Sequence, residues 1–98
     1  MTRCHDLQEV RDNIDRLDKQ ILELIGERSG FVREAARLKS RREEIIDRPR
    51  IEAIIVRVRK LAEEHGLAPD IAETVYRNMI DGFIAFEGEE FDRLHKKD

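Results

Sequence analysis

Two positively charged residues interrupt the apolar face of the long segment that opens the chain. Arg28 lies four residues after Leu24 and four before Val32, and Lys39 lies seven residues after Val32. At 3.6 residues per helical turn, both side chains point where the apolar side chains point. Burying an unpaired cation costs free energy, so each of these residues must reach solvent or meet an anion.

Two more cations and one acid lie on or beside apolar faces elsewhere in the chain. Arg11 borders the first turns of the same segment, and Arg50 opens the next one. Glu87 lies four residues after Phe83 on the apolar face of the last segment. Because burial disfavours an ionised carboxyl group, we expect Glu87 either to pair with a cation or to keep its proton. An ion pair between Arg28 and Glu87 is the simplest structural explanation of either residue.

The balance of these charges favours a binding site over simple pairing. One inward glutamate cannot balance four cations that lie on or beside apolar faces. An arginine presents a bidentate fork to a carboxylate, and a lysine presents a point charge. We therefore predict a site for a small molecule that carries several negative charges.

One unusually long helix is expected to carry three of these cations. Apolar residues at helical spacing run from Asp6, the expected N-cap with Glu9 as its capping-box partner, to about residue 41. Such a helix is roughly 50 Å long, whereas a compact domain of this size has a radius of gyration of about 13 Å. Because one chain cannot cover such a helix, we expect another chain to cover much of its apolar face.

Two further helices are expected after a loop over residues 40–47. Asp47 and Pro49 mark the start of the second helix, Gly66 follows its end, and Pro69 opens the third. The apolar residues expected to face inward are Ile51, Ile54, Ile55, Val58, Leu61 and Ala62 on the second helix, and Ala72, Val75, Tyr76, Met79, Ile80, Phe83, Ile84 and Phe91 on the third. The sequence thus predicts a single all-α domain over residues 1–98, with three helices.

Composition and charge argue against several classes of protein. Charged residues make up 42% of the chain and apolar residues 40%, and the sustained periodicity is unlike that of a disordered chain. The formal net charge of −3 and the lack of a basic stripe argue against nucleic-acid binding. The single cysteine, Cys4, excludes an intrachain disulfide and, with no paired Cys/His spacing, a zinc finger. We expect no membrane span and no signal peptide, and therefore a cytoplasmic protein.

The spacing of charges along the first helix resembles that of the all-helical chorismate mutases. Asp18 follows Arg11 by seven residues, Arg28 follows after ten more, and Lys39 after a further eleven. The resemblance continues through Arg50 at the start of the second helix and along the third helix. It covers nearly the whole chain, and the motifs are specific as a set.

The resemblance implies an enzyme that converts chorismate to prephenate, within the shikimate pathway and aromatic amino acid biosynthesis. It implies an intertwined homodimer with two equivalent sites. Each site would use Arg28, Lys39 and Arg50 of one subunit and Arg11 of the other. The reaction is a concerted pericyclic rearrangement of a dianion, so no metal or redox cofactor is expected.

The resemblance also implies a role for each candidate residue. Arg11 and Arg28 would hold the substrate carboxylates, with Arg50 near the anionic groups. Lys39 would face the ether oxygen, and a protonated Glu87 would donate a hydrogen bond to it. The catalytic candidates are Arg28, Lys39 and Glu87. The remaining substrate contacts would be Asp47 near the hydroxyl group, and Ile80 and Ile84 on the apolar wall.

Departures from the family pattern leave other functions open. Ile51 stands where many members carry a glutamate, with Glu52 one residue later, and Phe83 stands where many have a small polar residue. These departures resemble the isochorismate-pyruvate lyase branch of the same fold, which forms salicylate, although that branch usually has glutamine at the position of Glu87. A non-catalytic helical dimerisation or regulatory module is the third alternative, and the inward cations argue against it.

Overall fold

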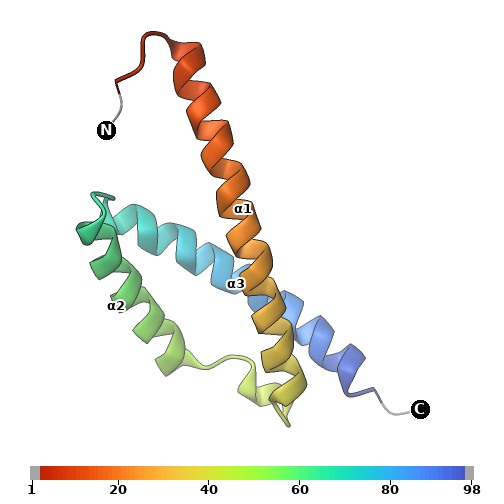
Figure 1. Cartoon of the computed structure of the whole chain (residues 1–98). Helices are drawn as coiled ribbons and strands as arrows, with labels where there is room; N and C mark the ends of the chain where they lie inside the picture. The colour runs from red at the N-terminus through yellow and green to blue at the C-terminus, as the bar shows by residue number, and fades with distance from the viewer. Residues whose placement is uncertain (1–2, 97–98) are drawn as a thin grey trace. The chain divides into compact units, whose positions relative to one another are not determined.

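The structure, a computed structural model, describes residues 3–96 as a chain of helices (Figure 1). Helix α1 spans Leu7–Leu38, α2 spans Arg48–Glu64 and α3 spans Pro69–Leu94, with a short 3-10 helix, η1, at Arg42–Glu44. The predicted all-α class with three helices is confirmed. The chain divides into two compact units, residues 1–31 and residues 32–98. The single domain over residues 1–98 stays a prediction.

The first unit contains most of α1, and Asp6 fixes the start of this helix. The Asp6 carboxylate accepts a hydrogen bond of 2.8 Å from the backbone N–H of Glu9, as expected of an N-cap. The Glu9 carboxylate accepts from the backbone N–H of His5 at 3.0 Å. The reciprocal bond of the expected capping box is therefore displaced by one residue, from Asp6 to His5.

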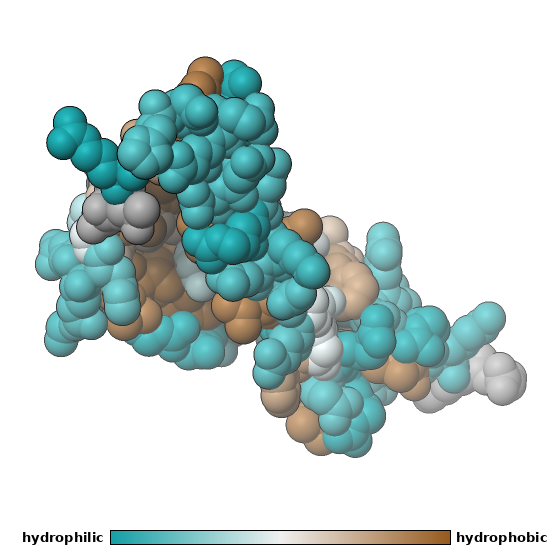
Figure 2. Space-filling model, turned by 45° about the horizontal axis from the view of Figure 1, so that its top comes forward, coloured by the Kyte–Doolittle hydropathy of each residue, from teal (hydrophilic) through white to brown (hydrophobic). Residues whose placement is uncertain are grey.

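The apolar face of α1 in this unit is exposed. Ile14 is 51% exposed and Leu24 is 65% exposed, and Leu7, Leu17 and Ile21 are exposed as well. Figure 2 shows apolar residues, in brown, at the surface of the molecule among the polar residues in teal. Exposed apolar side chains in such a row are typical of surfaces that bind a partner.

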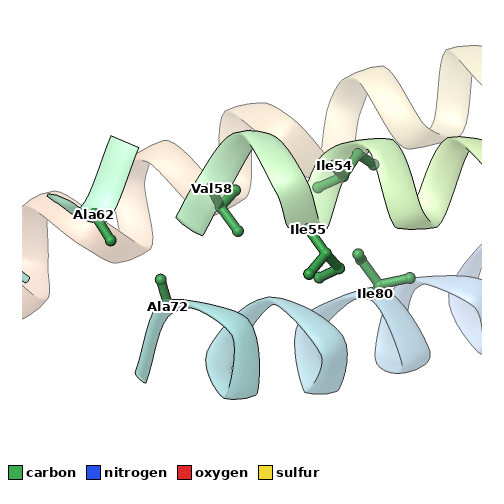
Figure 3. Packing of buried hydrophobic residues seen from close by; sticks show 6 residues of the cluster. All are labelled: Ile54, Ile55, Val58, Ala62, Ala72 and Ile80. Carbon is green, nitrogen blue, oxygen red and sulfur yellow. The ribbon is translucent and has the colours of Figure 1, made fainter. Parts of the chain in front are cut away.

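The second unit is built on the packing of α2 against α3. Its main core is formed by Ile54, Ile55, Val58, Ala62, Ala72 and Ile80. Figure 3 shows the side chains of Ile55 and Ile80 pointing toward each other from the two helices. A smaller core contains Ala36, Ile45 and Phe91, with Ile84 packed against both cores.

Two residues of the predicted core lie outside it. Leu61 is 43% exposed and Val75 is 54% exposed, although both were expected to face inward. Leu61 precedes the buried Ala62 by one residue, and Val75 precedes Tyr76, which packs against the main core. Since successive helical residues are about 100° apart, each side chain points well away from its buried neighbour.

The ends of α2 are fixed as predicted. The Asp47 carboxylate accepts a hydrogen bond of 3.0 Å from the backbone N–H of Arg50, and Pro49 lies in the first turn. Gly66 follows the helix with a φ of +71°, a left-handed conformation that residues with a Cβ seldom adopt. Among residues 3–96, none of the helices combines the length and the apolar character needed to cross a membrane.

The predicted end of the first helix near residue 41 is wrong, because α1 ends at Leu38. The backbone N–H of Lys39 still bonds the Ala35 carbonyl at 2.9 Å, but Arg41 has an extended backbone. Nε2 of His95 lies 3.0 Å from the Ala36 carbonyl oxygen. The last carbonyl groups of a helix lack intrahelical partners, so this contact stabilises the end of α1 at that point.

Candidate active site

The centre of the candidate site is an ion pair between the end of α1 and α3. Nζ of Lys39 lies 2.7 Å from Oε2 of Glu87, and the two side chains are 26% and 10% exposed. The predicted inward position of Glu87 is confirmed, and its carboxylate forms an ion pair with Lys39. An ammonium group carries three N–H donors, so Lys39 keeps two that this bond does not use.

The side chain of Arg42 links η1 to α3, close to Glu87. The Arg42 guanidinium bonds the Asp92 carboxylate at 3.2 and 3.4 Å. On its way it passes over Gly88, where an added Cβ would lie 3.1 Å from Nη2 of Arg42. The missing side chain at Gly88 permits this close approach, which places the loop after α1 beside the Lys39–Glu87 pair.

A second acid of α3, Glu90, ties the helix to α1 three residues after Glu87. Its Oε2 accepts a bond of 2.7 Å from Nε of Arg93, and its Oε1 accepts one of 2.9 Å from Nε of Arg33. The bond from Arg93, aided by Arg33 and opposed by burial, holds the pKa of Glu90 below its ordinary value. Neither the contact with Arg93 nor the one with Arg33 was predicted from the sequence.

Replacing Glu90 by glutamine is expected to lower the thermal stability of the protein most at neutral pH. Because the folded state lowers the pKa of Glu90, its ionised form stabilises the fold above the ordinary carboxyl pKa. That stabilisation is lost as pH falls through the pKa of the folded state. The difference in Tm between the parent and Glu90→Gln should therefore be largest near pH 7 and should shrink in acid.

The matched control is Glu89→Gln, because Glu89 is the exposed neighbour of Glu90. Both variants remove one carboxylate from the same turn of α3, so they change the net charge equally. Melting curves of the three proteins between pH 7 and pH 3 measure the effect. Equal Tm differences for the two variants at every pH would contradict a specific role of the Glu90 contacts.

Two neighbouring hollows of the second unit are lined by most of the substrate-contacting residues predicted within that unit. The lysine hollow is lined by Lys39, Glu44, Ile46, Asp47, Arg48 and Pro49. The isoleucine hollow is lined by Ile46, Arg48, Ile51, Glu52, Arg77, Ile80, Asp81 and Ile84. The isoleucine hollow has a volume of about 340 Å³, which is within the range of small-molecule sites.

The hollows bring together four of the predicted substrate contacts. Lys39 and Asp47 line the lysine hollow, and Ile80 and Ile84 line the isoleucine hollow. Arg50 is exposed and lines neither hollow.

The other two predicted cations belong to the first unit. Arg11 is exposed and Arg28 is half-buried. Their place in the site stays a prediction.

Glu52, the residue after Ile51, lines the isoleucine hollow and is held by Arg77. Ile51 packs against the main core, and the Glu52 carboxylate accepts two bonds from Arg77, at 3.0 and 2.9 Å. Arg77 also bonds Glu73 at 2.7 Å. The hydrogen bond from Arg77 lowers the pKa of Glu52, so this carboxylate is ionised and held in an ion-pair network between α2 and α3.

Arg48 is a residue of both hollows that the sequence interpretation missed. It precedes Ile51 by three residues and Ile55 by seven, a spacing that places all three on one side of a helix. The same reasoning that identified Arg28 and Lys39 would have identified Arg48 as a cation beside an apolar face.

Known proteins resemble this chain over most of its length. An isochorismate pyruvate lyase of Pseudomonas aeruginosa is 32% identical over 82 residues, which cover 84% of this chain and 81% of that protein. A chorismate mutase of Methanocaldococcus jannaschii is 30% identical over 92 residues, 93% of each chain. A T-protein of Enterobacter agglomerans is 38% identical over 76 residues, which cover 76% of this chain but 20% of that protein.

A family model covers the region that contains the candidate site. The model for chorismate mutase type II matches residues 10–88. This range includes every predicted site residue from Arg11 to Glu87. The chain belongs to the chorismate mutase type II family.

Proposed function

We propose that this chain is a chorismate mutase, which converts chorismate to prephenate. The observation that carries the proposal is the Lys39–Glu87 ion pair, largely removed from water, in a member of this family. Lys39 also lines a hollow together with Asp47. A second hollow, which shares the wall residues Ile46 and Arg48, offers the apolar surface of Ile80 and Ile84. This arrangement suits a substrate with an apolar ring and anionic groups.

The reaction requires positioning and electrostatic stabilisation from the protein. One C–O bond breaks while one C–C bond forms, so the atoms of the substrate are only rearranged. Holding the dianion in its compact reactive conformer lowers the barrier by orientation, and we assign this role to Arg11, Arg28 and Arg50. Negative charge grows on the ether oxygen as the C–O bond breaks, and we assign its stabilisation to Lys39.

Glu87 can support Lys39 in either protonation state. In the ion-paired form it fixes the position of the Lys39 ammonium, whose other two donors remain for the ether oxygen. A carboxylate cannot donate a hydrogen bond, so a direct contact between Glu87 and the ether oxygen requires the protonated acid. The protonated-donor role implied by the resemblance stays a prediction.

We also propose that the active form is a homodimer, with Arg11 contributed by the partner subunit. The exposed apolar face of α1, including Ile14 and Leu24, supports this proposal. Covering such a face with a second copy would remove it from water and stabilise the fold. A cytoplasmic location stays a prediction.

Isochorismate-pyruvate lyase activity is the second candidate function. It is supported by the 32% identity to a lyase of that name. It is also supported by Ile51, which leaves α2 without the glutamate expected there in many chorismate mutases. Cleavage of isochorismate to salicylate and pyruvate could use the same cationic residues, because that substrate is also a dianion.

The deciding experiment supplies the purified protein with chorismate and isochorismate in separate reactions. Prephenate from chorismate would support the proposed function, and salicylate with pyruvate from isochorismate alone would support the second candidate. The Lys39→Ala variant, purified in the same way, controls for contaminating enzymes. If neither substrate is converted faster than by this control, both proposals are wrong.

A further inference from the structure

We propose that Arg48 binds a carboxylate group of the substrate and so determines affinity for the dianion. This inference rests on the proposed function and adds a binding residue to the same site. Arg48 is the first residue of α2, directly after the N-cap Asp47. The bond from the Arg50 backbone N–H to the Asp47 carboxylate fixes the backbone that carries it.

Arg48 lies at the junction of the two hollows of the second unit. With Ile46, it lines both the lysine hollow and the isoleucine hollow. The lysine hollow adds Lys39 and Asp47, and the isoleucine hollow adds an apolar wall. A ligand whose ring contacts Ile80 and Ile84 can therefore present a carboxylate to the Arg48 guanidinium, which suits a bidentate contact.

The other cations of the two hollows already have carboxylate partners. Lys39 bonds Glu87 at 2.7 Å, and Arg77 bonds both Glu52 and Glu73. No ion pair of Arg48 is found within residues 3–96. The N–H donors of Arg48 can therefore contact a substrate without first breaking an ion pair. Those of Arg77 would have to break one.

The acids that line the hollows do not neutralise Arg48 by direct contact. Glu52 is held by Arg77, and Glu44 accepts a bond of 3.1 Å from the Ser40 hydroxyl. Arg77 is the main cause of the lowered pKa of Glu52, and the charge of Arg48 contributes less, from a distance. Asp81 lines the isoleucine hollow as well. Arg48 must therefore attract the substrate carboxylate more strongly than it attracts the Asp81 carboxylate.

Arg48 and Arg50, the arginine predicted at the site, lie on different sides of α2. Arg50 follows Arg48 by two residues, about 200° around the helix, so the two side chains leave α2 on nearly opposite sides. Arg50 lines neither hollow. Arg48 therefore meets the hollows from its own side of α2, and the contact proposed for Arg50 would be made outside the hollows.

The test compares steady-state kinetics of Arg48→Gln and Arg48→Lys with the parent on chorismate. A hydrogen-bonded contact with a charged group corresponds to about a 10- to 100-fold change in binding. We expect KM to rise about tenfold or more in Arg48→Gln, with kcat within about twofold of the parent. Arg48→Lys should recover part of the loss, because it keeps the charge without the bidentate fork.

Arg57→Gln is the matched control, since Arg57 is exposed on the same helix and lines neither hollow. It removes the same charge and should leave KM within about twofold of the parent. Calorimetric titration of each variant with prephenate measures binding without turnover. Melting curves verify that Arg48→Gln folds, as expected for an exposed residue.

The outcomes separate this inference from the proposed function. An active parent with the same KM and prephenate affinity in Arg48→Gln would overturn the role of Arg48 alone. A fall in kcat without a change in KM or prephenate affinity would overturn it too. A parent that neither converts chorismate nor binds prephenate would overturn the proposed function and this inference with it.

Discussion

Replacing Lys39 by alanine is expected to lower kcat by about 10³-fold, with a much smaller change in KM. The ammonium group lies in a site largely removed from water, where electrostatic interactions are stronger than at the surface. Removing one group that stabilises a developing oxyanion typically costs about 10²- to 10³-fold in kcat. Because the charge on the ether oxygen develops only in the transition state, the loss should appear in kcat.

The ion pair with Glu87 complicates the interpretation of this variant. Lys39→Ala leaves the Glu87 carboxylate, 10% exposed, without its ammonium partner, and an unpaired buried charge destabilises a fold. A loss of activity could then reflect partial unfolding. The double variant Lys39→Ala/Glu87→Gln removes the unpaired charge, so its Tm should return toward that of the parent while kcat remains low.

Arg41→Ala is the control for the loss of a nearby positive charge. Its side chain is 73% exposed and its contact with Glu44 is at 3.7 Å, so it should retain near-parental kcat and Tm. A kcat for Lys39→Ala within tenfold of the parent would remove Lys39 from the mechanism. Full recovery of kcat in the double variant would show that only the fold had been damaged.

Local signals in the sequence were sufficient to predict most of the fold. Asp6, Asp47, Gly66 and Pro69 each act through contacts or conformations within a few residues, and each marks a helix end in the structure. At the end of α1, by contrast, the Ala36 carbonyl oxygen is contacted by His95, which is 59 residues away. Helical periodicity carries no information about such a contact, so the predicted helix extended to about residue 41.

The same distinction applies to the candidate site. The inward position of Glu87 followed from its helical spacing, because burial on an amphipathic helix is a local property. Its ion pair with Lys39 joins residues 48 positions apart, and the bond between Arg33 and Glu90 spans 57 positions. Among several inward cations, the sequence alone could not select the one that meets Glu87.

The second large effect is expected from mixing two inactive variants, Arg11→Ala and Arg28→Ala. If each site takes Arg28 from one subunit and Arg11 from the other, both homodimers have two defective sites. In the mixed dimer, the Arg11→Ala chain supplies Arg28 and the Arg28→Ala chain supplies Arg11 to the same site. That site is intact, while the other site of the mixed dimer lacks both arginines.

The expected recovery follows from random subunit exchange in an equal mixture. Half of the dimers are then mixed, and each has one intact site of two, so about a quarter of the parent's activity should return. Each variant alone should retain about 1% of the parent's activity, since it loses a charged contact to the substrate. Activity before and after joint unfolding and refolding measures the gain, and native mass spectrometry verifies that mixed dimers have formed.

Lys39 provides the matched controls for this experiment, because the proposal places it in the same site as Arg28 of its own chain. Mixing Arg11→Ala with Lys39→Ala should also restore about a quarter of the activity, since one site again contains every residue. Mixing Arg28→Ala with Lys39→Ala should restore nothing, because each site of that mixed dimer lacks one of the two residues. If Arg11 serves the site of its own chain, the mixture of Arg11→Ala and Arg28→Ala has no intact site either. If mixed dimers of Arg11→Ala and Arg28→Ala are verified but activity does not recover, the shared site is contradicted. If the Arg28→Ala and Lys39→Ala mixture recovers activity, the placement of Arg28 and Lys39 in the same subunit's part of the site is contradicted.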